Sequence, residues 1–172
     1  QFSEEFQAIY DGDRLNGLVG FYYLSANALT SFDVLLSGGA LDVFTSADVD
    51  TRAWSIFGDF TFDVSDRLAV SVGGRYTKDE RSIYLRRQVF LGGLSPTFGG
   101  PLRPPFAVQT DLNAAANFDD FSPRASISYK INDDHTTYVS YAKGFKGGSF
   151  DPRCVAVTAP NIDGDAVPGA LD

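Results

Sequence analysis

Apolar and polar side chains alternate with a period of two along residues 53–78, and this pattern predicts a β-hairpin. A polar turn at residues 63–67 separates the two predicted strands, and the alternation resumes at residues 68–77. One face of the first strand carries large apolar side chains and a glycine, at Trp54, Ile56, Gly58, Phe60 and Phe62. We therefore expect two antiparallel strands that share one apolar face.

The two faces of this hairpin differ in a way that bears on function. Trp54 and Tyr76 lie on the apolar face at the end away from the turn, and Phe62 lies near the turn. Aromatic side chains in such positions are typical of the boundary between hydrocarbon and water. The opposite face carries Asp59 and Arg75. A membrane barrel with a polar lumen accounts for both faces at once, whereas a soluble sheet accounts for each separately, so the hairpin alone leaves both open.

Two further hairpins follow from the same pattern. Residues 3–10 and 14–24 alternate around an Asp-Gly turn, although the second face of 14–24 is mixed and leaves its orientation open. Residues 121–131 alternate cleanly, and residues 136–146 return after a polar turn at 132–134. The faces of this last strand are ambiguous. Placing Lys143 in lipid would cost about 2 to 4 kcal/mol, which favours turning it to the lumen.

The connections are predicted to alternate between short and long. Residues 25–51 are irregular, with a short helix or a small hairpin possible, and residues 81–118 form a second long connection. Four prolines and four glycines in residues 92–106 exclude a paired inner strand there. Consecutive connections of an antiparallel meander lie at opposite ends, so all short turns share one side. Short turns on one side and long loops on the other are typical of outer-membrane barrels.

Composition excludes several classes of protein. The formal net charge is -8 and the pI is about 4.5, which argues against a nucleic-acid partner. No apolar run approaches the roughly 20 residues of a transmembrane helix. The sequence contains no methionine and starts at Gln1 without a secretory leader, so we expect an internal piece of a longer protein.

Three segments together resemble the barrel of TonB-dependent outer-membrane receptors. They are residues 2–26, residues 54–81 (WSIFGDFTFDVSDRLAVSVGGRYTKDER) and residues 121–153 (FSPRASISYKINDDHTTYVSYAKGFKGGSFDPR). The resemblance implies a closed barrel of about 22 strands with a plug domain inside. It implies an outer-membrane location, a TonB partner reached through the plug, and uptake of a scarce small-molecule ligand. Ferric siderophores are the first expectation, with cobalamin or carbohydrates as other options.

We expect residues 1–172 to be a partial barrel domain of about six strands without a plug or a TonB-contacting motif. Six strands leave two unpaired edges, and unsatisfied backbone groups in lipid cost several kcal/mol each. We therefore expect that the isolated chain does not form a native closed pore.

Candidate chemistry is sparse, and we expect no catalytic residue, metal ligand or cofactor. His135 is the only histidine and lies in a predicted turn. The acidic pairs Asp48 with Asp50 and Asp163 with Asp165 lack the full ligand series of a calcium loop. Cys154 is the only cysteine and is interpreted as an incidental thiol or the partner of a cysteine elsewhere.

Charged side chains on the predicted lumen face are the candidate ligand-binding residues. They could contact the plug or an anionic ligand in transit, but pairing across strands that keeps the lumen polar is the favoured interpretation. For the arginines of the second long connection, a solvated loop is favoured over an anion site. The lumen candidates are Asp59, Arg75, Arg124 and Lys130, and the loop arginines are Arg81, Arg86, Arg87 and Arg103.

Three alternatives to a TonB-dependent receptor remain open. A passive porin shares the barrel pattern and would lack a plug. A soluble carbohydrate-binding β-sandwich would be recovered without detergent. An outer-membrane barrel enzyme is disfavoured, because the sequence offers no serine, histidine and acid set with reachable partners.

Overall fold

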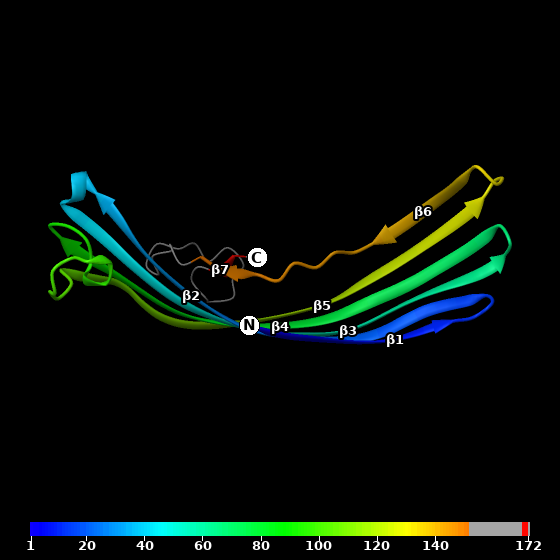
Figure 1. Cartoon of the computed structure of the whole chain (residues 1–172), viewed down its shortest axis with the longest axis horizontal. Coiled ribbons are helices and arrows are strands. Elements are labelled where there is room, and N and C mark those ends of the chain that lie inside the picture. The colour runs from blue at the N-terminus through cyan, green and yellow to red at the C-terminus, as the bar shows by residue number, and fades with distance from the viewer. Residues whose placement is uncertain (152–169, 172) are drawn as a thin grey trace. The chain divides into compact units, whose positions relative to one another are not determined.

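The computed structural model describes residues 1–151 and 170–171 and consists mostly of β-strands. Six strands form one sheet in which each strand pairs with its neighbours in sequence (Figure 1). Two short 3-10 turns, Ser37–Gly39 and Pro96–Phe98, interrupt the strands, and a separate pair is formed by β7 (Ser149–Phe150) and β8 (Ala170–Leu171). The sheet contains β1 (Phe2–Asp11), β2 (Leu15–Leu36), β3 (Leu41–Ser65), β4 (Leu68–Leu91), β5 (Ala107–Lys130) and β6 (Thr136–Ala142).

The chain divides into two compact units, and each long strand contributes to both. The turn-side unit comprises residues 1–25, 52–79 and 118–147, and it contains the three tight turns. The loop-side unit comprises residues 26–51, 80–117 and 148–172. Within residues 1–151 and 170–171, no helix is long and apolar enough to cross a membrane.

Strand register in the turn-side unit assigns the faces that the sequence left open. Phe6 lies opposite Phe21 in the antiparallel pair of β1 and β2, so the odd-numbered side chains of β2 join the apolar face of β1. Ile127 lies opposite Val139 in the pair of β5 and β6, so Val139 belongs to the apolar face of β5. Because β6 ends at Ala142, Lys143 stands outside the alternation.

The three predicted tight turns are present, although the middle one is confined to Asp66 and Arg67 because β3 continues to Ser65. The Gly12 amide donates to the Leu15 carbonyl over 3.1 Å and closes the first turn. The Ile131 amide donates to the His135 carbonyl over 2.9 Å and closes the last. Polar residues fill both turns, as expected where the chain reverses next to solvent.

The connection between β2 and β3 is shorter than predicted. Residues 25–51 were expected to be long and irregular, but β2 and β3 continue through them as a hairpin joined by Ser37–Gly39 and Ala40. Gly38 and Gly39 have φ of 66° and 91°, so this Gly-Gly pair supplies a tight turn. Residues 81–118 are also mostly strand. Their loop is confined to residues 92–106, the proline- and glycine-rich stretch.

A small apolar core lies in the loop-side unit. Ala47 of β3 and Ile83 and Leu85 of β4 are buried against one another. Phe150 of β7 packs on this cluster together with partly buried side chains of β3 and β5, at Val49, Leu112 and Ala114. Three residues singled out from the sequence, Cys154, Asp163 and Asp165, lie outside the described residues.

Candidate functional site

The turn-side unit exposes one apolar face. Val139 is 77% exposed and Ile127 54% exposed, although neither has a polar atom in its side chain. At the end away from the turns, the rings of Trp54 and Tyr76 lie 5.7 Å apart. Residues 54–62 match the ~9 to 11 residues with which a tilted strand crosses a membrane. Further exposed side chains of this face are Phe6, Val19, Ile56, Phe60, Phe62, Val72, Phe121 and Tyr129. An apolar surface this extensive needs an apolar surrounding, which lipid provides.

The opposite face carries an ion pair between strands that are not neighbours. Arg124 of β5 donates a hydrogen bond from Nη2 to Asp59 Oδ1 of β3 over 3.3 Å, and its Nε lies 2.7 Å from Asp59 Oδ2 in the same ion pair. The pair passes over β4 at Gly73, where a Cβ atom would lie 2.2 Å from Asp59 Oδ2. Because glycine has no side chain, this position makes room for the Asp59 carboxylate.

Arg75 of β4 lies on the same face, between two aromatic rings. Its guanidinium carbon is 5.7 Å from the ring centre of Tyr22 and 5.6 Å from that of Phe57, within the range of cation–π attraction. Its Nε donates to the Thr77 hydroxyl over 3.2 Å. Arg75 borders a hollow of about 300 Å³ whose other lining residues are Leu18, Phe57, Gly58, Asp59, Gly74, Ser122 and Arg124.

The fourth lumen candidate, Lys130, lies apart from the other three. Lys130 closes β5 at its turn end, and its ammonium is 2.9 Å from Asp133 of the same turn. Its backbone amide donates to the Arg67 carbonyl of the neighbouring turn. The structure thus brings Asp59, Arg75 and Arg124 together and leaves Lys130 as a turn residue.

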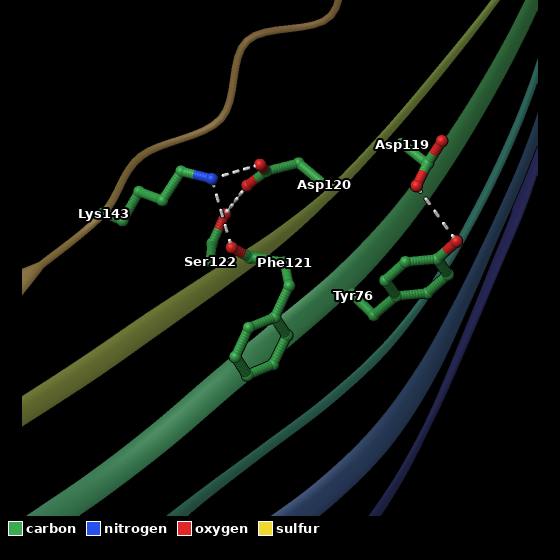
Figure 2. A network of polar contacts seen from close by, with 6 residues as sticks. All are labelled: Tyr76, Asp119, Asp120, Phe121, Ser122 and Lys143. Carbon is green, nitrogen blue, oxygen red and sulfur yellow. Dashed lines mark hydrogen bonds and ion pairs between the residues drawn. The ribbon is translucent and has the colours of Figure 1, made fainter.

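A polar network at the end of β6 was not predicted from the sequence (Figure 2). Lys143 forms an ion pair with Asp120 of β5 and also donates to the Phe121 carbonyl over 3.4 Å. The Ser122 hydroxyl donates to the other oxygen of Asp120 over 2.9 Å. The Phe121 ring points away from this network in Figure 2. Lys143 follows the end of β6, so its ion pair with Asp120 does not require the odd-numbered side chains of β6 to face the lumen, and Val139 lies on the apolar face instead.

The loop of residues 92–106 is held by specific contacts. The buried Ser95 donates to Asp33 of β2 through its amide (3.0 Å) and through its hydroxyl (2.8 Å to Oδ1). Arg103 donates to the carbonyls of Gly92, Gly93 and Leu94, and its guanidinium lies 5.9 Å from the Phe90 ring centre. A solvated loop was the favoured interpretation, and Arg103 lies half-buried in this loop, where it binds loop carbonyls.

Asp42 of β3 lies beside this docked loop. Its side chain is fully buried, and both carboxylate oxygens lack a hydrogen-bond donor. Burial raises the pKa of Asp42, and the neighbouring charge of Asp33 raises it further, against a smaller lowering by Arg103. Asp42 precedes Trp54 by 12 residues, which places it beyond the membrane-crossing part of β3.

The remaining candidate residues form no recognisable reactive site. His135 is exposed in its turn, with Nδ1 3.0 Å from Asn132 Oδ1. Asp48 and Asp50 both accept from the Asn27 amide. Arg86 lies 3.9 Å from Asp111. In the part of the chain that the structure describes, no three His, Cys, Asp or Glu side chains are grouped as a metal site would require.

These two faces agree with the comparisons to known proteins. A family model described as "TonB dependent receptor-like, beta-barrel" matches residues 1–168. The chain belongs to this TonB-dependent receptor family. Barrels of the family lie in the bacterial outer membrane and belong to receptors and transporters, not to an enzyme family. The predicted resemblance, the all-β barrel class and the outer-membrane location are thereby confirmed.

A solved structure provides an independent comparison of the fold. The chain is similar to the ferric yersiniabactin uptake receptor FyuA from Yersinia pestis, with 18% sequence identity and a TM-score of 0.64. The match covers 87% of this chain and 21% of the FyuA chain. At this identity the likeness concerns the fold alone, and this TonB-dependent receptor chain spans about a fifth of the length of that relative.

Proposed function

We propose that this chain forms part of the barrel wall of a receptor that takes up a scarce ligand across the outer membrane. The family match over residues 1–168 is the observation that supports this role most strongly. Transport is driven through TonB, and a ferric siderophore is the first candidate ligand. The uptake receptor FyuA is similar in fold and supports this choice of ligand class by analogy only.

The domain proposal follows from the sheet. Residues 1–172 supply wall strands, and the plug that would contact TonB is contributed from outside them. β1 lies at one edge of the sheet, and β6 pairs with β5 only from Arg124 to Lys130. Backbone groups at these edges require partners in lipid, so further strands complete the barrel.

Disruption of the gene tests the transport role. Cells grown under iron limitation should lose uptake of radiolabelled iron complexed to one siderophore, and a plasmid copy should restore it. Uptake in the complemented cells should stop when a protonophore removes the energy source. Uptake that persists with the protonophore would indicate a passive porin. Recovery of the protein in the soluble fraction without detergent would instead indicate a soluble β-sandwich and would contradict the proposal.

A further inference from the structure

The positive charge of Arg75, on the polar face of the turn-side unit, forms no ion pair with another described residue. Asp59 and Arg124 neutralise each other through two contacts. Among the described residues, Arg75 has no acidic partner. Its only hydrogen bond there comes from Nε, which donates to Thr77, so the two terminal nitrogens keep their donors. One full positive charge therefore remains beside the hollow.

The surroundings of Arg75 hold its guanidinium in place. The rings of Tyr22 and Phe57 flank it, and Phe57 lies over Gly20, where a Cβ atom would come within 2.4 Å of the ring. The Thr77 hydroxyl fixes Nε. A guanidinium held in this way loses little conformational freedom when it binds a partner.

The chemistry of the vacant donors defines the group that they can bind. A guanidinium presents parallel N–H donors whose spacing matches the two oxygens of a carboxylate or phosphate. The adjacent hollow of about 300 Å³ is at the small end of ligand-binding cavities and is bordered by Leu18 and Phe57 as well as by polar groups. An oxyanion attached to an apolar or aromatic group would bind the guanidinium with its oxygens and fill the hollow with its apolar group.

The geometry points to Arg75 as the binding residue for an oxyanion, in the first place a carboxylate, on the inner face of the barrel wall. Two sources can supply this group. One is the ligand in transit, and the other is a segment of the protein that lies inside the barrel. The Asp59–Arg124 pair lines the same hollow, but its charges are paired with each other, so we assign it no role in binding the oxyanion. The inference uses the outer-membrane barrel fold and does not depend on which ligand is imported.

Thermal unfolding of the protein purified from outer membranes in detergent tests the inference. Arg75→Gln removes the charge, and Arg86→Gln is the matched control in an exposed arginine of the same strand. Sodium benzoate is the probe, because it joins a carboxylate to a ring. Sodium chloride controls for ionic strength, and benzyl alcohol controls for the ring without the charge.

Two results would support the inference, and they distinguish the two sources of the oxyanion. If the site is open, benzoate raises Tm by about 2 °C or more in the wild type and in Arg86→Gln but not in Arg75→Gln. If a carboxylate of the protein occupies it, Arg75→Gln lowers Tm by a similar amount, and Arg86→Gln, which loses only an exposed 3.9 Å contact with Asp111, lowers it by less. That difference then shrinks between about 50 mM and about 500 mM NaCl, since salt screens an ion pair.

The inference is overturned if Arg75→Gln responds to benzoate like the wild type and any Tm difference between them is independent of salt. The assay measures binding and stability in the purified protein. A failed uptake experiment would therefore refute the transport proposal and leave this result standing, and the reverse also holds.

Discussion

Asp59 of β3 and Arg124 of β5 form an ion pair across the intervening strand β4, with Nε 2.7 Å from Oδ2. The two residues are 65 positions apart in the sequence. The pair is possible because Gly73 of β4 has no side chain to displace the Asp59 carboxylate. A backbone feature of one strand thus determines which charges of its two neighbours can meet.

Gly73→Ala and the adjacent Gly74→Ala should therefore have unequal effects. A Cβ atom at Gly73 would lie 2.2 Å from Asp59 Oδ2 and 2.9 Å from the Gly58 carbonyl oxygen, so both must shift. At Gly74 it would meet only the end of the Phe121 ring closely, at 2.9 Å, and that ring can move outward. We expect Gly73→Ala to lower the free energy of unfolding by about 1 to 3 kcal/mol and Gly74→Ala by less. Chemical denaturation of both variants measures this, and the reverse order would contradict the account.

The Asp59–Arg124 pair should contribute little to stability by itself. The Asp59 side chain is 25% exposed and that of Arg124 61% exposed, so water screens the attraction. A double-mutant cycle with Asp59→Asn and Arg124→Gln should give a coupling free energy of about 0.5 to 1 kcal/mol that falls with added salt. A salt-independent coupling of several kcal/mol would show that the pair is shielded from water.

The sequence was sufficient to predict the turn-side unit because its period-two alternation is strong. Clean alternation in residues 54–62 and 121–131 placed Asp59 and Arg124 on one face. Alternation does not specify which charges pair, since that depends on register and on small residues such as Gly73. Lys130 shares the parity of Arg124 but finds Asp133 within its own turn, three residues away.

The loop-side unit was predicted less well for a different physical reason. Polar residues occur there inside the strands, such as the half-buried Asp33 and the buried Asp42, and they interrupt the alternation that would have indicated strands. The partner of Asp33 is Ser95, which lies 62 residues away in the sequence. Contacts over this separation leave no periodic signal in the sequence.

Stability should depend on the protonation of Asp42. Because burial raises its folded-state pKa above 3.8, the folded protein binds the proton more tightly than the unfolded chain. The free energy of unfolding should therefore fall as the pH rises from 3.8 through the raised pKa, and it should stay lower above it. Asp42→Asn removes this titration. Thermal unfolding of both proteins between about pH 4 and about pH 8 should give a Tm difference that changes with pH in this direction. A constant difference would show that Asp42 titrates normally.

Ser95→Ala should release the loop of residues 92–106 from β2. The substitution removes the hydroxyl that donates to the two carboxylate oxygens of Asp33 over 2.8 and 2.9 Å. Removing one partner of a buried hydrogen bond costs about 1 to 3 kcal/mol of stability. Limited proteolysis should cut this loop faster in the variant. Ser31→Ala is the control, because Ser31 makes only a 3.3 Å contact to Ser46. Equal cleavage rates in both variants would mean that the Ser95 hydroxyl does not hold the loop, although its backbone amide still donates to Asp33.

The central claim is that the turn-side unit presents one face to lipid and the other to a polar lumen. Spin labels at single cysteines test it most directly, in membranes and with Cys154 replaced by serine. Labels at Ile127 and Val139 should be relaxed by oxygen, which concentrates in lipid. Labels at Ser126 and Ser140 should be relaxed by a water-soluble nickel complex. If all four labels respond alike to the nickel complex, both faces meet water, and the barrel-wall account is wrong.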